Sequence, residues 1–564
     1  MNSHPLEHTW SHTPPFVGKI VPFAEQMLSF TKQDYIELIL QINFWKSQHV
    51  RACDREDALK EVIKHKEAII RDLTQRLYGK KSEKGGCKPD VNPNASSDKN
   101  LKRVRGRQKG SSNHGRTQRP NLPIIPEIIP LNEIACEKCG LAYSFLSEEE
   151  SDIIEIEVAA HIRRIKRQKC VKNCKCFPGA KIITAPVLSK LVPRSPYGNS
   201  IWEELLLKKF LHAQPVNRTL NDFKSHGLDI SPGTVAGSFQ KLTPLFVSVY
   251  KAFHQQQMTE NRFHNDETRW EVYEQIEGKT GHRWYLWLTR SNSVVYYRMD
   301  PTRSADVPLT HFSDLISKIV IVICDRYSAY KKLARLNLAI ILAFCWAHVR
   351  RDFLDFARRY ADLKDWGLDW ADEISILFHL NNQRIALWDS RLSITKQSPL
   401  FQESHRVLGS ALDAMRTRCD TLLNENKTAE ENYGKRHGTL TVTQCKVLMS
   451  LQDHWKGLIV FYDYPEVKMD NNPAEQSMRN PVIGRNGYYG SGSLWSAELA
   501  AMMFSIFQTM LLWNLNPRTW LHLYFEACAQ HGGKSPEDLS EFLPWLMSED
   551  RLQKLSKPPQ SNTS

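Results

Sequence analysis

The sequence predicts a mixed α/β protein in which a sheet-containing domain is followed by a long helical region. Strand-like stretches come in series between residues 269 and 298 and then alternate with helix between 319 and 346. This order is typical of a mixed α/β sheet. From residue 353 to about 460 the patterns are helical and strand-poor. A chain of 564 residues, 41% of them hydrophobic, is long enough for several domains and a sizeable core.

Residues 52–78 are expected to form a helix in the N-terminal part of the chain. Apolar residues recur there at alternating steps of four and three, with polar interruptions at Glu56 and Lys66. This spacing is typical of a heptad seam, which predicts a coiled coil and self-association. An ordinary amphipathic helix packed on its own domain explains the pattern equally well, so both interpretations stay open.

Two segments carry a strong positive charge. Residues 101–119 lie in a stretch without apolar periodicity, 80–120, and contain seven Lys or Arg and no acid. Residues 161–175 contain seven more, again without an acid. We expect a disordered basic arm and a basic ribbon that lie on DNA phosphates, whereas a solvated linker and a solvated face are the alternatives. The arginines that would contact DNA here are Arg103, Arg105, Arg107, Arg163, Arg164 and Arg167.

Five of the twelve cysteines lie close together and predict a small metal-binding module. Cys136 and Cys139 form a CxxC pair, the spacing that lets two thiolates reach one Zn²⁺. The second pair is ambiguous, because Cys170 with Cys174 and Cys174 with Cys176 are both possible, and we favour Cys170 with Cys174. Four thiolates leave no open coordination position, so the predicted zinc is structural.

Composition limits the class of protein. The chain has 75 Lys and Arg against 62 Asp and Glu, a formal net charge of +13, which favours a polyanionic partner such as nucleic acid or an anionic membrane. Charged residues at 24% and aromatic residues at 10% exclude wholesale disorder. The longest apolar run, Leu338–Ala347, is too short to span a bilayer, and no secretory pattern is visible. We therefore expect a cytoplasmic protein.

Three carboxylates lie near the ends of predicted elements. Asp325 follows a short apolar strand, where an unpaired buried charge is costly. Asp266 lies just ahead of a strand-like segment. Glu475 lies one turn inside a helix that Asp470 or Asn471 would cap. Carboxylates from two strands and a helix are the ligands that a pair of divalent cations requires, and Mg²⁺ (or Mn²⁺) suits such a set.

Several motifs resemble the bacterial insertion-sequence-66 transposase family, over residues 55 to 547. They are RLYGKKSEK, HNDETRW, ICDRYSAY, FCWAHVRRDF, DNNPAEQSMRNPVIGR and EFLPWLM, in this order. The resemblance implies a ribonuclease-H-like DDE catalytic domain with a helical insertion, preceded by a zipper-like segment and a zinc-binding module. The expected divisions are an N-terminal helical segment (1–79), a basic linker (80–120), a zinc module (121–185), a helical DNA-binding or connecting region (186–255), the catalytic domain in two parts (256–353 and 461–525), the insertion (354–460) and a helical tail (526–564).

The resemblance also implies roles for single residues. Asp266, Asp325 and Glu475 match the catalytic acids of the family, and the insertion accounts for the long gap between the last two. Arginines in the neighbouring motifs would contact phosphate or support the carboxylates, with surface ion pairs as the alternative. His348 in the CWAHVRR motif could equally be a structural histidine. These arginines are Arg350, Arg351, Arg479 and Arg485.

The function that the resemblance implies is DNA transposition. The transposase would cut a strand at the end of an insertion sequence, and the freed 3′-hydroxyl would attack target DNA. Its partners would be double-stranded DNA, further copies of the chain and two small accessory proteins of the same element, in a bacterial cytoplasm and associated with the nucleoid. A nuclease of the same fold without strand transfer, and a zinc-dependent DNA-binding regulator with an inactive catalytic domain, are the alternatives.

Overall fold

A computed structural model describes most of the chain and divides it into two units. One comprises residues 1–94 and 357–364, and the other comprises residues 95–356 and 365–564. The predicted arm with Arg103, Arg105 and Arg107 lies outside the described residues, as do Cys136, Cys139, Cys174 and Cys176. The described residues are 31–78, 160–171, 182–186, 190–192, 195–315, 319–433 and 438–557.

The N-terminal unit contains one long helix, α1 (Lys32–Tyr78), of 47 residues. It begins twenty residues before the predicted start. The prediction relied on a heptad seam, and the residues before position 52 do not continue that seam. Thr31 caps it: the Asp34 backbone N–H donates to Thr31 Oγ1 (3.2 Å), and the Thr31 N–H donates to Asp34 Oδ2 (3.2 Å). Large apolar side chains such as Leu40 and Trp45 are exposed along it. Self-association through α1 stays a prediction.

The second unit is built on a five-stranded sheet with the order β5-β4-β3-β6-β7. β5, β4 and β3 pair antiparallel, and β3, β6 and β7 pair parallel. All five residues of β6 are buried, which explains its unbroken apolar sequence. The prediction of a mixed α/β fold is confirmed. The strands are β3 (Arg262–Glu271), β4 (Arg283–Arg290), β5 (Val295–Asp300), β6 (Val320–Cys324) and β7 (Ile340–Phe344).

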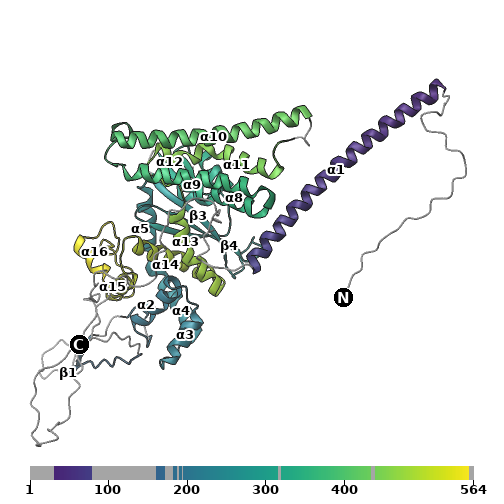
Figure 1. The fold of residues 1–564 in the computed structure, drawn as a ribbon. Helices are drawn as coiled ribbons and strands as arrows, with labels where there is room; N and C mark the ends of the chain where they lie inside the picture. Colours follow the sequence, from purple (N-terminus) through teal and green to yellow (C-terminus); the bar gives the residue numbers. More distant parts are fainter. Residues whose placement is uncertain are drawn as a thin grey trace, which may run out of the picture. The chain divides into compact units, whose positions relative to one another are not determined.

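Two hydrophobic cores pack around this sheet, and helices complete both of them (Figure 1). The first core contains side chains of α2 (Asn199–Leu206), the π-helix Leu207–Leu211, α4 (Pro232–Leu242), α5 (Val247–Met258), α14 (Leu494–Leu512) and α15 (Pro517–Gln530). The second contains side chains of α7 (Ser328–Leu336), α8 (Trp346–Arg359), α9 (Lys364–Ala386), α10 (Pro399–Tyr433) and α11 (Val442–Leu458).

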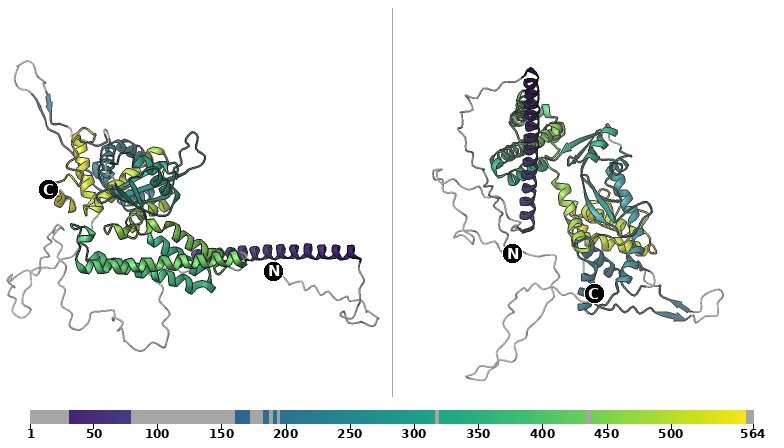
Figure 2. Two further views of the ribbon diagram at one scale, coloured as in Figure 1. Left: turned by 90° about the horizontal axis from the view of Figure 1, so that it is seen from above. Right: turned by 90° about the vertical axis from the view of Figure 1, so that its right-hand side faces the viewer.

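The helices between β7 and residue 463 form a group beside the sheet, as the strand-poor pattern predicted. Figure 1 shows α9, α10 and α11 above strand β3 and α2, α3 and α4 below it, and the right-hand view in Figure 2 also separates the two groups. The predicted strand after residue 340 ends at Phe344, and α8 begins at Trp346. Shorter elements complete the unit: α3 (Val216–Ser225), α6 (Asp306–His311), α12 (Val460–Asp463), α16 (Glu549–Ser556) and the 3₁₀ turns Thr243–Phe246 and Ile394–Lys396. The 3₁₀ turn Ala361–Leu363 belongs to the N-terminal unit.

Helix α14 is long and apolar enough to cross a membrane by length and composition, and no other described helix is. Two thirds of its apolar window is nevertheless buried inside the protein. Its hydroxyl groups bond the edge strand β5: the Tyr297 N–H donates to Ser505 Oγ (2.8 Å) and the Val295 N–H donates to Thr509 Oγ1 (3.0 Å). α14 is therefore a core helix that covers the edge of the sheet.

The end of β3 is joined to the segment that follows α13 (Asn472–Tyr488). The Ser491 N–H donates to the Glu271 carbonyl oxygen (2.8 Å), and Trp270 Nε1 donates to Ser491 Oγ (3.1 Å). Gly490, the residue before Ser491, has a φ of +125°. A Cβ atom at this position would fall inside the van der Waals radius of the Glu271 carbonyl oxygen, so only glycine fits.

Replacing this glycine should therefore weaken the fold. We expect Gly490→Ala to lower the free energy of unfolding by about 3 kcal/mol, because it combines backbone strain with a clash against β3. Urea unfolding followed by circular dichroism measures the change. Gly492→Ala is the matched control, since nothing lies within 4 Å of a Cβ atom at that position. Equal stability of the two variants would contradict the assigned role of Gly490.

Candidate active site

Two of the predicted acids lie side by side at one end of the parallel strands. The sequence predicted Asp266 just ahead of a strand, but Asp266 lies inside β3. The strand begins at Arg262, seven residues before the strand-like stretch that the sequence predicted from Arg269. Asp325 directly follows β6. The pairing of His264 with Ile323 places Asp266 opposite Asp325, two residues further along both strands. Side chains two residues apart point to the same face, so both acids share one face of the sheet.

Helix α13 brings the third acid. Glu475 lies in the first turn of α13 and is partly exposed. The carboxylates of Asp325 and Glu475 both act to raise the pKa of Asp266, which shows that the three acids share one electrostatic environment. The structure therefore brings together the three acids that the sequence predicted.

The buried side chain of Asn471 fixes the start of α13 on the sheet. Its Nδ2 donates to the Asn265 carbonyl oxygen (2.8 Å), and His264 Nδ1 donates to its Oδ1 (3.0 Å). Its backbone N–H donates to Cys345 Sγ (3.3 Å). Asn471 occupies the N-cap position, but its side chain forms no capping bond, because β3 engages it instead. Asp470 Oδ1 accepts the Asn472 N–H (3.0 Å).

Side chains of strands β4 and β5 also donate hydrogen bonds to the first turns of α13. Arg290 Nη1 donates to the Pro473 carbonyl oxygen (2.9 Å) and to Ser477 Oγ (3.0 Å). The hydroxyl group of the buried Tyr297 donates to the Ser477 carbonyl oxygen (2.6 Å). Sequence reasoning missed Arg290 and Tyr297, because neither belongs to a motif. The position of Glu475 thus depends on side chains from three strands.

The carboxyl group of Asp266 is only weakly acidic. Burial, together with the negative charges of Glu267, Asp325 and Glu475, raises its pKa to about 7. The Glu267 backbone N–H donates to Asp266 Oδ1 (2.9 Å) and opposes this shift. A proton or a bound cation must therefore offset the gathered negative charge near neutral pH.

Two side chains of α8, His348 and Arg351, lie close to the carboxylate of Glu475. His348 Nε2 lies 3.7 Å and Arg351 Nη2 lies 3.8 Å from Glu475 Oε1. Desolvation and the nearby Arg351 charge lower the pKa of His348, which favours its neutral imidazole. Glu475 Oε1 and His348 Nδ1 are both buried, and no hydrogen-bond donor or acceptor in the described chain reaches either atom. Such atoms are typical of a site whose ligand completes it.

A fourth carboxylate, that of Glu267, follows Asp266 in the chain, and both of its oxygen atoms accept hydrogen bonds. Its side chain is 2% exposed. Tyr330 OH donates to its Oε2 (2.6 Å), and Arg303 donates to its Oε1 through Nε (3.0 Å) and Nη2 (2.5 Å). Residues alternate across a strand, so Glu267 lies on the opposite face of β3 from Asp266. Sequence reasoning did not single out Glu267 or Arg303.

The predicted DNA-contacting arginines fall into two groups. Arg485 Nη1 donates to Thr268 Oγ1 (2.9 Å) and to the Arg269 carbonyl oxygen (2.6 Å), and Arg350 Nε donates to Ser375 Oγ (3.0 Å). These two arginines join elements of the fold. In contrast, the following side chains are exposed: Arg163, Arg164, Arg167, Arg351 and Arg479. DNA contact by any of them stays a prediction.

The predicted basic ribbon is partly described. β1 (Lys169–Val171) and β2 (Ile182–Thr184) pair antiparallel. Arg167 Nη1 donates to the Ala185 carbonyl oxygen (3.1 Å) across this ribbon. Cys170 lies on β1 and is exposed, whereas its predicted partners in zinc binding lie outside the described residues. The zinc site stays a prediction.

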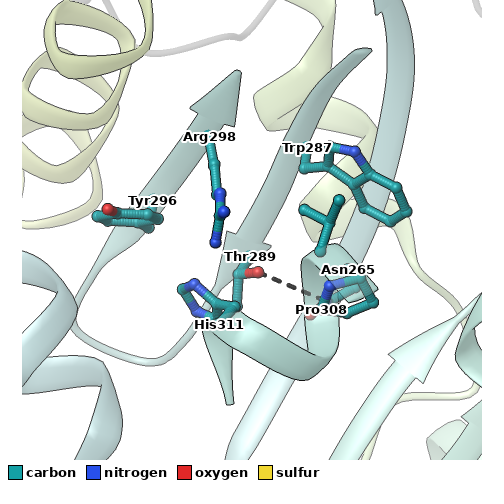
Figure 3. Close-up of a pocket in the computed structure, with 8 residues that line it drawn as sticks. Asn265, Trp287, Thr289, Tyr296, Arg298, Pro308 and His311 are labelled. Carbon is teal, nitrogen blue, oxygen red and sulfur yellow. Dashed lines mark hydrogen bonds between the residues drawn. The ribbon is translucent and has the colours of Figure 1, made fainter. Parts of the chain in front are cut away.

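A small cavity lies on the Glu267 face of the sheet. Its volume is about 10 Å³, and its lining includes Asn265, Thr289, His311 and Arg298. Figure 3 shows Asn265 and Thr289 on neighbouring strands, joined by a hydrogen bond of 3.4 Å. This volume holds about one water molecule, so the cavity is no substrate pocket.

A mixed sheet that gathers three carboxylates at the end of two parallel strands is the kind of acidic centre that divalent cations and phosphoryl groups occupy. The chain belongs to the Transposase IS66 family, whose sequence model matches residues 194–499. That range contains the three acids and four of the six motifs, HNDETRW, ICDRYSAY, FCWAHVRRDF and DNNPAEQSMRNPVIGR. It confirms the family that the motifs indicated.

Curated relatives cover much of the chain. It is 24% identical over 434 residues to "Uncharacterized protein y4hP" of Sinorhizobium fredii (strain NBRC 101917 / NGR234), covering 73% of each chain. It is 25% identical over 469 residues to "Uncharacterized protein y4jD" of the same organism, covering 80% of this chain and 85% of the relative. No solved structure matches the chain.

Removal of the Asn471 side chain should loosen α13. We expect Asn471→Ala to lower the free energy of unfolding by about 2–4 kcal/mol, because it leaves a buried carbonyl and a buried imidazole without partners. Urea unfolding measures the change. Asn472→Ala is the matched control, since Asn472 is the exposed neighbour. A loss of stability in the control as large as that in Asn471→Ala would contradict this role.

The raised pKa of Asp266 predicts a pH-dependent cost to the fold. Between about pH 4 and pH 7 the folded chain keeps a proton on Asp266 that the unfolded chain loses, so this group costs more stability as the pH rises. Asp266→Asn should thus gain thermal stability over wild type across this range and keep a constant advantage above about pH 7. Thermal unfolding from pH 5 to 8 in Mg²⁺-free buffer measures the difference.

Glu466→Gln, which alters an exposed acid, is the control and should follow wild type. Added Mg²⁺ should reduce the advantage of Asp266→Asn above pH 7, since a cation offsets the charge in wild type. A difference that does not change with pH would count against the raised pKa.

Proposed function

We propose that this chain is a DDE transposase that cuts DNA at the ends of an insertion sequence and joins the freed 3′-hydroxyl to target DNA. The observation that carries the proposal is the meeting of Asp266, Asp325 and Glu475 at the end of the parallel strands. Family membership supports the general activity. The cut and the joining step are both displacements at phosphorus, so one acidic centre can serve both.

The strand order supports a ribonuclease-H-like catalytic domain. Three antiparallel strands followed by two parallel strands, with β3 in the middle, put one acid on the central strand and the next on its parallel neighbour. The third acid arrives on a helix that follows the inserted helices. This arrangement explains why 150 residues separate Asp325 from Glu475 along the chain.

The three acids fit two Mg²⁺ or Mn²⁺ ions in their donor chemistry. All three offer carboxylate oxygens, a cation would stabilise the ionised form of Asp266 that burial and its neighbours disfavour, and Glu475 Oε1 is buried without a hydrogen-bond donor among the described residues. When bound, such ions activate an attacking oxygen and stabilise the leaving one. The chain's own contribution is to hold the acids rigidly, through Asn471 and Arg290, before DNA arrives.

Exposed cations around the acids supply a path for the DNA backbone. Arg351 and Arg479 lie on α8 and α13, close in sequence to His348 and Glu475 respectively. Arg163 and Arg164 lie in the basic stretch that leads into the β1–β2 ribbon. We propose that these side chains contact phosphates, that the ribbon belongs to a structural Zn²⁺ module, and that α1 pairs copies of the chain.

We further propose a cytoplasmic, nucleoid-associated location in a bacterium, and accessory proteins of the same element as partners.

Substitution of one acid tests the catalytic assignment. In the presence of Mg²⁺, we expect wild type to cut a labelled element end and transfer it to target DNA. Asp325→Asn should lower both rates by at least about a thousandfold while DNA binding stays unchanged, since the acid holds cations and not DNA. Gel assays of cleavage and strand transfer, with binding measured by fluorescence anisotropy, provide the readout.

Glu466→Gln is again the matched control and should cut like wild type. Cleavage without strand transfer would favour a nuclease of the same fold. DNA binding without cleavage in wild type would favour a regulator, and undiminished cleavage by Asp325→Asn would refute the assignment of the acids.

A further inference from the structure

A second set of ligand atoms lies beside the three acids and shares one of them. The Sγ atom of Cys345, a ring nitrogen of His348 and a carboxylate oxygen of Glu475 all lie within 4.8 Å of one another. Cys345 is buried, and the other two side chains are about 30% exposed. Solvent therefore reaches the group from one side.

The surrounding backbone fixes the sulfur atom in place. Cys345 lies between β7 and α8, and its N–H donates to the Cys324 carbonyl oxygen (3.1 Å). Its Sγ accepts the Asn471 N–H from the start of α13 (3.3 Å). His348 follows three residues later in the first turn of α8, a spacing that places two side chains on the same side of a helix. The group is thus assembled by the same contacts that position Glu475.

Two atoms of this group have unmet bonding capacity. Glu475 Oε1 and His348 Nδ1 are buried and have no hydrogen-bond partner among the described residues. Burying polar atoms without partners is costly unless a ligand satisfies them. Arg351, the cation nearest to Glu475, is 54% exposed on a long side chain and can move aside.

The donor set differs in kind from that of the three acids. A thiolate, an imidazole and a carboxylate are the ligands that Zn²⁺ and similar soft or borderline cations prefer, whereas Mg²⁺ prefers oxygen atoms alone. Three protein ligands also leave one position of a tetrahedral ion open. The chemistry therefore selects a cation other than the one that the acids suit.

We propose that Cys345, His348 and Glu475 form a binding site for Zn²⁺ or a cation of similar chemistry, and that its occupation inhibits cleavage by withdrawing Glu475 from Asp266 and Asp325. The inhibitory effect rests on the proposed function, but binding does not. Because Glu475 belongs to both sets, Zn²⁺ and Mg²⁺ compete for it.

Zinc binding by the full chain tests the site directly. Against a chromophoric chelator, Cys345→Ser should bind one Zn²⁺ fewer than wild type with measurable affinity, since loss of a ligand weakens such a site by at least about a hundredfold. Serine keeps an acceptor for the Asn471 N–H, so the fold should persist. Cys419→Ser is the matched control, because Cys419 is another buried cysteine with one backbone hydrogen bond.

Glu475→Gln provides a second variant, which should lose the same Zn²⁺ without altering a buried thiol. Zinc bound elsewhere, for example by the cysteines of the predicted zinc module, should be the same in wild type, Cys345→Ser, Glu475→Gln and Cys419→Ser. Equal zinc binding by wild type, Cys345→Ser and Glu475→Gln would overturn the proposal.

Cleavage assays separate this inference from the proposed function. At constant Mg²⁺, Zn²⁺ that saturates the site should slow wild type at least about tenfold, while Cys345→Ser should keep most of its own zinc-free rate. Equal sensitivity of both to Zn²⁺ would overturn the inhibition and leave the transposase proposal intact. Loss of the Zn²⁺ in Cys345→Ser, with no Mg²⁺-dependent cleavage by wild type, would uphold the site and refute the proposed function.

Discussion

The attachment of α13 to β3 is the constraint on which the rest of the acidic centre depends. Asn471 joins the start of the helix to His264 and to the Asn265 carbonyl, and the Ser491 segment joins its far end to Glu271. A helix fixed at both ends on one strand cannot slide or rotate relative to that strand. Glu475 is consequently held in register with Asp266 although the chain between them passes through the whole helical group.

Gathering acids in this way opposes the fold, and the structure offsets the charge unequally. Arg303 forms an ion pair with Glu267 on one face of β3, and Tyr330 OH donates a hydrogen bond to it. On the other face Asp266 has only a backbone N–H donor, and its pKa rises. Arg351 lies 3.8 Å from Glu475 on this face, whereas no cation of the described chain offsets the charge of Asp266. The protein therefore places its unfavourable electrostatic energy where an external cation can relieve it.

The sequence predicted the acids well because each follows a local signal. Asp325 ends an apolar run that only a buried strand explains, and Glu475 follows a helix start. The residues that position them could not be predicted in this way. Arg290 and Asn471 act on parts of the chain roughly two hundred residues away, and such contacts leave no periodic trace in the sequence. The early start of β3 was missed because the polar residues Arg262, His264 and Asn265 interrupt its apolar pattern.

The distribution of charge separates DNA affinity from chemistry. Residues 101–119 and 161–175 together account for the whole positive excess of the chain, so the remainder is nearly neutral. Electrostatic attraction to phosphates scales with the number of cations that meet them, and it would come chiefly from these two segments. A sheet with clustered acids repels phosphate unless cations occupy it. If the proposed function holds, cation binding would decide whether DNA held by the basic segments can approach Asp266 and Asp325. The shared residue Glu475 would then be the point at which a competing cation acts most strongly.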